Sequence, residues 1–249
     1  MIVLKSPSEI AVMQRAGHIL ADVLDWLPTL VRPGVSTLAI DTEVEALIRL
    51  RGATPAFKGY LGFPATVCVS INAEVVHGIP SADRRLREGD IVSVDLGCIV
   101  EGYYADCAAT FAVGEIPAPA RTLLDVTRES LDLAIDACRV GRRLSDVSHA
   151  VQTHVERHGL AVVRAFVGHG IGRALHEEPE VPNFGDRGHG LRLRAGMVLA
   201  IEPMVTMGAP EVDVQEDGWT AVTRDRSLSA HFEHTVAITE QGPLVLTRY

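Results

Sequence analysis

The stretch VSVDLGCIVEGYYADC, residues 92–107, places two aspartates, Asp95 and Asp106, inside runs that otherwise have the pattern of buried β-strands. Aspartate is depleted from strands and is rarely buried unless another group pairs with it. One such aspartate would be explained by a strand end or a turn in contact with water. Two of them in neighbouring apolar runs require a different explanation.

The dipeptide Glu101-Gly102 divides this stretch and resembles the two-residue turns that β-hairpins prefer. With this turn, the register pairs Gly97 with Asp106 and Asp95 with Ala108. The two aspartates then lie diagonally on one face of the sheet, with backbones roughly 7–8 Å apart. Two close carboxylates on a buried face repel each other, so they must share a proton or hold a cation.

The composition is that of an ordinary globular protein, with 249 residues, 47% hydrophobic and 22% charged. We expect one domain over residues 1–249, with internal halves of about 1–115 and 116–249, and no feature of the sequence requires more than a monomer.

The net charge of -9 disfavours a nucleic-acid or membrane partner. Four scattered cysteines without a C-x-x-C pair argue against structural zinc and against disulfides, which makes the cytoplasm the default location.

The helices are predicted from amphipathic spacing and end signals. The first begins at a capping box with Ser6 as N-cap and closes at the RPG of residues 32–34, and three others cover 36–51, 118–138 and 145–158. Strand-like segments follow each pair of helices. Two of these predicted strands, residues 196–205 and 231–239, carry acidic residues inside apolar runs.

An internal repeat relates the two halves at an offset of 107 residues. The pattern of a glycine, a short turn and an amphipathic helix runs over 34–52 and again over 141–159. We interpret this as an ancient duplication. The order of elements predicts an α+β fold with pseudo-two-fold halves, each of two helices followed by strands. The strands join into one central antiparallel sheet, which helices cover on one face and which collects polar residues on its concave face.

The second half supplies further candidate metal ligands. His169 lies in the glycine-rich GHGIG, Glu202 in the apolar run VLAIEPMV, and Glu233 in HFEHTVAIT. Any one of these would be explained as a satisfied core residue, but the combination with the two aspartates is hard to explain that way. An oxygen-rich set of this kind suits two divalent ions, manganese, iron(II) or cobalt, better than a tetrahedral structural zinc, although zinc stays open as a catalytic ion.

Four motifs resemble those of the type I methionine aminopeptidases, which are metallopeptidases of the pita-bread fold: the two aspartates eleven positions apart, GHGIG followed by His176, IEP, and SLSAHFEHT. The resemblance extends over nearly the whole chain. Only 25 residues separate His176 from Glu202, which leaves no room for the helical insertion of type II relatives. The ligands that the resemblance implies for a dinuclear metal site are Asp95, Asp106, His169, Glu202 and Glu233.

The resemblance also implies an activity, the removal of the N-terminal methionine from nascent proteins with a small second residue. In that family a metal-activated hydroxide attacks the first peptide bond. The implied roles are oxyanion stabilisation for His176, contact with the scissile nitrogen for His77, and proton transfer for Glu202. The methionine side chain is expected in a pocket of soft and aromatic groups, formed by Tyr60, Phe63, Cys68 and Trp219.

Three finer expectations follow from the same resemblance. Leu175 stands where many relatives have an aromatic residue, so we expect altered affinity with retained methionine preference. A monovalent cation is expected near Asn72 and Ser229. The implied substrate also suggests transient contact with the ribosome.

Two alternative functions stay open at this point. The first is a proline-specific aminopeptidase or dipeptidase, because such enzymes share the fold and the five ligand types. The CVSIN and DGWT segments favour methionine. The second alternative is a non-catalytic relative that binds peptides, which would be expected to have lost metal ligands.

Overall fold

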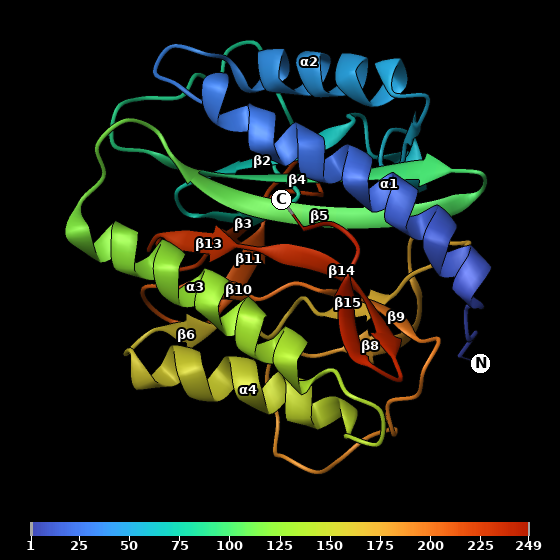
Figure 1. Cartoon of the computed structure of the whole chain (residues 1–249). Coiled ribbons are helices and arrows are strands. Elements are labelled where there is room, and N and C mark those ends of the chain that lie inside the picture. Colours follow the sequence, from blue (N-terminus) through green and yellow to red (C-terminus); the bar gives the residue numbers. More distant parts are fainter. Residues whose placement is uncertain (1, 249) are drawn as a thin grey trace.

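The computed structural model describes residues 2–248 and contains four long helices (Figure 1). Ser6 caps the first of them as predicted, because its hydroxyl accepts from the amide of Glu9 while the Glu9 carboxylate accepts from the amide of Ser6 at 2.8 Å. The four predicted helices are confirmed, except that the first ends earlier, in a short 3-10 turn, η1 (Leu27–Thr29). Their bounds are α1 (Pro7–Trp26), α2 (Thr37–Leu50), α3 (Ala118–Ala137) and α4 (Leu144–Arg157).

A nine-stranded antiparallel sheet forms the centre of the fold, in the order β1-β4-β5-β14-β9-β7-β8, with β2 paired to β4 and β15 paired to β14. The two halves join where Glu233 of β14 pairs with Ala108 of β5. The bounds of these strands are β1 (Thr54–Pro55), β2 (Val67–Ile71), β4 (Ile91–Val100), β5 (Tyr103–Ala112), β7 (Gly168–Gly170), β8 (Glu177–Val181), β9 (Val198–Ile201), β14 (Glu233–Thr239) and β15 (Gly242–Val245).

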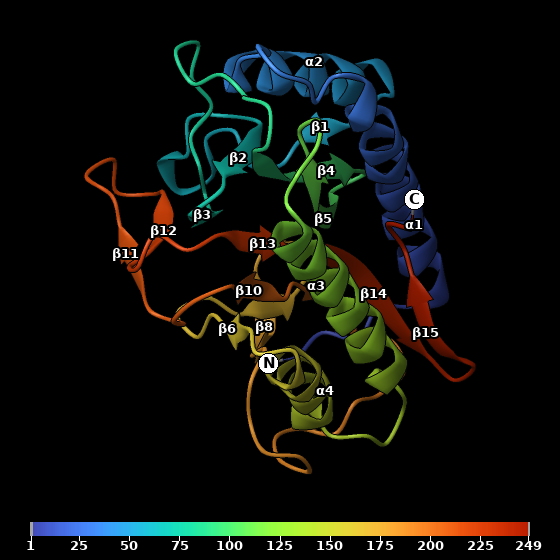
Figure 2. The same ribbon diagram turned by 90° about the vertical axis from the view of Figure 1, so that its left-hand side faces the viewer.

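Two three-stranded sheets, which the sequence did not predict as separate sheets, complete the structure. One contains β6 (Ala161–Val162), β10 (Met204–Thr206) and β13 (Ser229–His231). The other contains β3 (Glu74–Val76), β11 (Val212–Val214) and β12 (Ala221–Thr223). Figure 2 shows α1 on the opposite side of the central strands from β3, β11 and β12.

The predicted hairpin of β4 and β5 is confirmed in its turn and its register. Glu101 and Gly102 both have positive φ, 49° and 78°, as a tight hairpin turn requires. Gly97 pairs with Asp106, and Asp95 pairs with Ala108. The two aspartates therefore lie on the same face of the sheet.

Two runs that were predicted as continuous strands are broken, and in this respect the prediction was wrong. The first run splits between Ile201 and Met204, so that Glu202 lies in the break and not in a strand. Pro203 has no N–H to donate to a ladder, which explains the interruption. The second run splits at Phe232, whose amide donates to the Pro203 carbonyl at 3.4 Å. The two breaks therefore face each other.

The duplication is visible in equivalent main-chain hydrogen bonds. Gly34 donates to the Leu86 carbonyl at 2.8 Å, and Gly141 donates to the Leu193 carbonyl at 2.9 Å. Both residues of the second bond lie 107 positions after those of the first. In Figure 1 the pairs α1–α2 and α3–α4 lie above and below the central strands, in keeping with pseudo-two-fold halves.

The core lies between the helices and the central sheet. The buried faces of α1 and α3 contribute Leu20, Leu24, Leu123 and Leu131, which pack in one cluster with strand residues such as Leu96. Within residues 2–248, none of the helices has the length and apolar character that a membrane span needs.

We predict that Gly17→Ala destabilises the protein by about 2 kcal/mol. The steric overlap of the added methyl group is expected to cost more free energy than the higher helix propensity of alanine contributes. Gly17 lies in the middle of α1, and a Cβ there would overlap the carbonyl oxygen of Leu246. Urea unfolding measures the effect. Ala11→Gly, at an exposed position of the same helix, isolates the propensity contribution of about 1 kcal/mol. A Gly17→Ala protein more stable than the parent would show that the helix yields at this contact.

Candidate active site and metal centre

A cavity of about 250 Å³ brings together all eleven residues that the sequence singled out for catalysis, metal binding and substrate binding. They come from both halves of the chain. The predicted residues in its lining are Tyr60, Phe63, Cys68, His77, Asp95, Asp106, His169, His176, Glu202, Trp219 and Glu233. The cavity is therefore the candidate active site.

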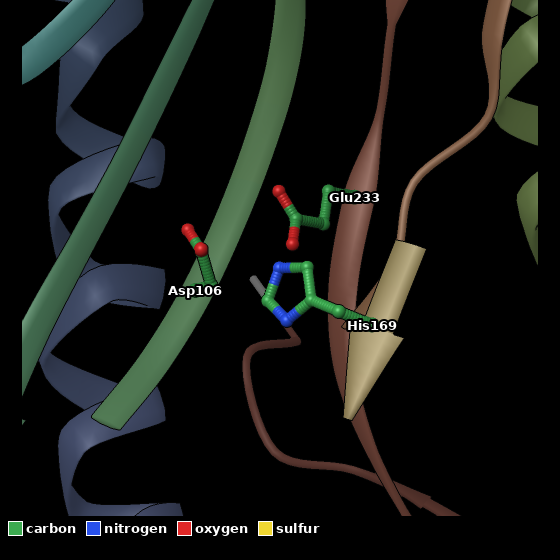
Figure 3. A group of neighbouring side chains, drawn as sticks. All are labelled: Asp106, His169 and Glu233. Atoms are coloured by element: carbon green, nitrogen blue, oxygen red, sulfur yellow. The ribbon is translucent and has the colours of Figure 1, made fainter. Parts of the chain in front are cut away.

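Three of the five predicted ligands converge most closely. Asp106 of β5, His169 of β7 and Glu233 of β14 each offer one ligand atom, and these atoms lie within 4.8 Å of one another. Figure 3 shows the Glu233 and His169 side chains side by side, with the Asp106 carboxylate across from them on the neighbouring strand. The Nδ1 atom of His169 donates to the Gly170 carbonyl at 2.9 Å, since a carbonyl oxygen can only accept. The Nε2 atom of this neutral imidazole is therefore left with its lone pair for a metal.

The other two predicted ligands border this group. Asp95 of β4 lies diagonally across the hairpin from Asp106. Glu202 lies in the break after β9, where its Oε1 atom is 3.5 Å from His169 Nε2. The Glu202 side chain is 14% exposed and lines the same cavity. All five candidate ligands thus face one small volume.

The electrostatics of this group favour a bound cation. Burial raises the pKa of Asp95 to about 7, and burial together with the charges of Glu233 and Asp95 raises the pKa of Asp106 well above its usual range. Burial and neighbouring carboxylates also raise the pKa of Glu202 and of Glu233. The residues from the described part of the chain that line the cavity include no lysine or arginine to offset these charges.

Unpartnered oxygens give the same indication. Among residues 2–248, Asp95 Oδ1, Asp106 Oδ1 and Glu233 Oε1 are buried and have no hydrogen-bond partner. A buried carboxylate oxygen without a partner is costly, whereas a divalent cation would satisfy all three at once. Carboxylates with one imidazole are the donors that divalent ions of intermediate hardness prefer. The residues present therefore fit a divalent metal centre.

The two candidate histidines outside the ligand set lie on the cavity wall. His176 Nδ1 is 2.8 Å from the Tyr60 hydroxyl, and the His176 ring lies 4.4 Å from that of His169. Burial lowers the pKa of His176, and burial together with the nearby His176 lowers the pKa of His77 to about 4. Both imidazoles are therefore neutral near pH 7, so either can serve as a hydrogen-bond donor or acceptor.

An apolar compartment adjoins the candidate metal ligands. The rings of Phe63 and Trp219 meet edge to face with centroids 5.1 Å apart, and Cys68 is buried beside them. Leu175 is buried in the same cluster. The sequence did not single out several other lining residues, whose apolar character gave no local signal: Phe57, Leu61, Val76, Phe166 and Val167.

His231 was also missed. It is 1% exposed, and neither ring nitrogen has a hydrogen-bond partner among the described residues. Its Nε2 atom lies 3.8 Å from Glu202 Oε2 and 4.0 Å from Glu233 Oε2. Burial lowers its pKa to about 3, so the ring is neutral behind the carboxylates. Its position two residues before Glu233 was the available signal, since alternate residues of an extended segment share a face.

The residues expected near a monovalent cation are neighbours in space. Ser229 donates its amide to the Asn72 carbonyl at 2.8 Å. The Asn72 side chain is engaged with Asp90 and with the amide of Ile91.

Comparison with known proteins agrees with this geometry. The sequence of residues 11–240 matches that of metallopeptidase family M24. The chain is 51% identical over 247 residues to methionine aminopeptidase of Clostridium acetobutylicum, which covers 99% of each chain. The crystal structure of methionine aminopeptidase from Thermotoga maritima matches with a TM-score of 0.98 at 49% identity over 100% of both chains. Prolidase from Pyrococcus horikoshii matches with a TM-score of 0.80 at 23% identity, over 100% of this chain and 64% of that one, which shows a common fold alone. The chain therefore belongs to metallopeptidase family M24 and, within it, to the methionine aminopeptidases.

Proposed function

We propose that the chain releases the N-terminal methionine from nascent proteins whose second residue is small, by hydrolysis of the first peptide bond. This function is supported above all by one observation. A single cavity contains the five candidate metal-ligand side chains and an apolar compartment that suits the thioether side chain of methionine. A substrate whose methionine fills that compartment would present its first peptide bond to the ligand group. Identity of 51% to a methionine aminopeptidase over 99% of both chains supports this choice over a proline-specific activity.

Asp95, Asp106, His169, Glu202 and Glu233 would hold two divalent ions, which we propose are manganese, iron(II) or cobalt, with zinc as a further candidate. When bound, such ions lower the pKa of water and polarise a carbonyl oxygen. The protein supplies the rest of the chemistry. Glu202, in the break after β9, would take a proton and return it to the leaving amine.

The two histidines would orient the peptide bond. Because the Tyr60 hydroxyl faces His176 Nδ1 at 2.8 Å, donation from Tyr60 would fix the His176 proton on Nε2. That N–H is then available to a developing oxyanion. His77, packed edge to face on Phe166 with centroids 5.4 Å apart, would contact the scissile nitrogen.

Tyr60→Phe is expected to lower kcat up to about 10-fold while KM for methionine peptides changes little, because the ring stays and one hydrogen bond is lost. Kinetics on Met-Ala-Ser measure both constants. The ¹⁵N chemical shifts of His176 in the metal-free protein report its tautomer independently of turnover. Unchanged shifts with unchanged kcat would exclude a role for the hydroxyl in orienting His176.

Leu175→Phe is expected to change KM by up to about 10-fold and to leave the preference for methionine intact, since the side chain lines the compartment and is not one of the candidate ligands. Matched tripeptides beginning with Met or Leu measure this preference in the parent and the variant. If the parent hydrolysed both equally well, Leu175 would have loosened the pocket more than we expect.

The deciding experiment uses metal-stripped protein with manganese, iron(II), cobalt or zinc added back one at a time. Release of methionine from Met-Ala-Ser that depends on added metal is expected. Activity confined to Xaa-Pro peptides would overturn the proposal in favour of a proline-specific enzyme. Inactivity with every metal would instead favour a peptide-binding relative.

We infer one catalytic unit over residues 1–249, acting as a monomer in the cytoplasm with transient ribosome contact. One central sheet shared by both halves supports a single unit, and four buried, unpaired cysteines suit a reducing compartment. We also propose that a monovalent cation binds beside Asn72 and Ser229.

A further inference from the structure

His77 occupies an unusual backbone conformation immediately after β3. Its φ of 61° lies in the left-handed region, which a residue with a Cβ adopts only at a cost that its surroundings must offset. The next residue, Gly78, has no space for a side chain, because a Cβ there would overlap the Val69 carbonyl oxygen. The segment that presents His77 is thus held tightly against β2.

From these contacts we propose that Arg84 and Glu74 are positioning residues for His77, forming a clamp that keeps the imidazole directed into the cavity. This inference rests on the proposed function, in which His77 contacts the substrate. Neither residue is among those that line the cavity, and neither is a candidate metal ligand. Their action on the reaction would pass through the backbone of His77.

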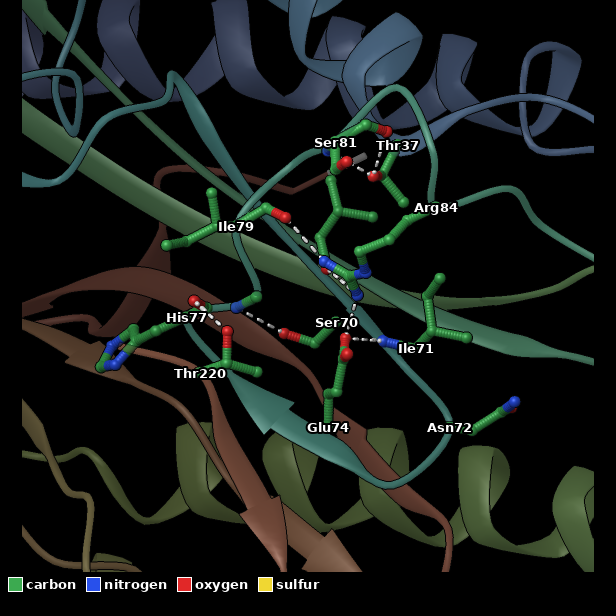
Figure 4. A network of polar contacts seen from close by, with 12 residues as sticks. Thr37, Ser70, Ile71, Asn72, Glu74, His77, Ile79, Ser81, Arg84 and Thr220 are labelled. Atoms are coloured by element: carbon green, nitrogen blue, oxygen red, sulfur yellow. Dashed lines mark hydrogen bonds and ion pairs between the residues drawn. The ribbon is translucent and has the colours of Figure 1, made fainter. Parts of the chain in front are cut away.

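Arg84 ties the two sides of the His77 segment together. Its guanidinium donates to the Ile79 carbonyl at 2.6 Å and to the Val69 carbonyl at 3.3 Å, and it forms an ion pair with Glu74. Figure 4 shows the arginine side chain reaching from its own segment to the carbonyl two residues after His77. One side chain therefore fixes both the strand β2 and the chain that leaves His77.

Glu74 anchors the other end of the segment. Its carboxylate accepts from the Ile71 amide at 2.8 Å while it pairs with Arg84. The side chains are 28% exposed for Arg84 and 18% for Glu74, so the pair is largely shielded from water. A charge-assisted bond in such a place is stronger and more directional than one on the surface.

Two further bonds close the loop around His77. The Gly78 amide donates to the Ser70 hydroxyl at 3.1 Å, and the Val69 amide donates to the Gly78 carbonyl at 2.8 Å. The Thr220 hydroxyl lies 3.5 Å from the His77 carbonyl, although its shorter contact is with Asp217 at 2.6 Å. Each of these contacts joins the His77–Gly78 segment to a single partner, whereas the Arg84 guanidinium links three separate points, Val69, Glu74 and Ile79. We therefore expect its loss to let the left-handed turn relax.

The test is a double-mutant cycle between Arg84→Met and His77→Ala. Methionine keeps much of the arginine stem and removes all the donors. In the parent background, Arg84→Met is expected to lower kcat about 10- to 100-fold with a smaller change in KM, because misplacement of a reacting group acts on the rate. In the His77→Ala background, the same change should cost less than about 2-fold.

Arg85→Met is the matched control. Arg85 is adjacent in sequence and exposed, and its guanidinium bonds the Gly34 carbonyl at 2.8 Å, away from His77. It should keep the activity of the parent. Glu74→Gln, which removes the ion pair and can still accept from Ile71, provides a milder variant if Arg84→Met folds poorly, and it should show the same dependence on His77.

The possible outcomes separate the two proposals. The clamp proposal would be wrong if Arg84→Met lowered kcat equally in both backgrounds, or if it lowered the thermal stability and left kcat unchanged. Either result would leave the proposed function intact. If His77→Ala alone kept full kcat, the role of His77 in the proposed function would fail, and the clamp with it. A loss that appears only when His77 is present would establish the clamp.

Discussion

Glu202→Gln is expected to lower kcat for methionine release by about 10²- to 10⁴-fold, the range that a positioned proton-transfer group contributes. Glutamine keeps the shape of the side chain but can neither take up a proton nor supply a carboxylate to a metal. Glu202 sits in the break after β9, with its carboxylate 3.5 Å from His169 Nε2 and directed at the cavity. Steady-state kinetics on Met-Ala-Ser at saturating metal measure the loss.

The control is Glu216→Gln, at an exposed position in the turn between β11 and β12, which should leave kcat unchanged. Metal titration of the Glu202→Gln protein separates its two roles, because weakened binding can be compensated with excess metal whereas lost proton transfer cannot. A Glu202→Gln protein that regained the parent kcat at high metal would show that Glu202 is a ligand alone.

The part of the fold that could be predicted depends on local signals. The hairpin register followed from a two-residue turn, since the period of a strand then decides which residues share a face. The sequence alone therefore predicted that Asp95 and Asp106 share one face, and the observed register confirms it. The helix bounds followed from caps and apolar spacing, and the capping box at Ser6 is present as predicted.

The part that could not be predicted depends on contacts between distant segments. The break at Glu202 has a local signal in Pro203, but the break at Phe232 accompanies its bond to the Pro203 carbonyl, a long-range pairing that the second run does not reveal alone. Phe57 and Phe166 line the cavity because of where the folded chain carries them. Likewise, the role of Arg84 is apparent only once Ile79 and Val69 lie on either side of its guanidinium.

Removal of metal is expected to make the stability of the protein fall as the pH rises from 7 to 8. The folded-state pKa of Asp106, Glu202 and Glu233 is raised well above its ordinary value, and that of Asp95 is raised to about 7. Near pH 7 the metal-free folded state still binds a proton at Asp95 that the unfolded state has lost, and the raised pKa values of the other three carboxyls act in the same direction. The free energy of unfolding therefore decreases with pH.

Histidines act with the opposite sign at lower pH. Burial lowers the pKa of His77 and His169 to about 4, so the unfolded chain binds protons there that the folded chain does not, and the contribution of these histidines to stability rises with pH from about 4 to about 6.5. Above pH 8 the buried cysteines contribute, because burial raises the pKa of thiols such as Cys138 to about 12. The interval from pH 7 to 8 isolates the carboxylates.

Urea unfolding at pH 7 and pH 8, with chelator and then with manganese, measures both parts of this prediction. A metal at about 100 times its Kd is expected to add about 3 kcal/mol and to abolish the decline with pH, since the cation takes the place of the bound protons. Asp106→Asn should show a shallower decline without metal and less stabilisation with it. If chelator left the stability of the parent flat between pH 7 and 8, the buried carboxylates would not be what the metal neutralises, and the five-residue ligand set would have to be reconsidered.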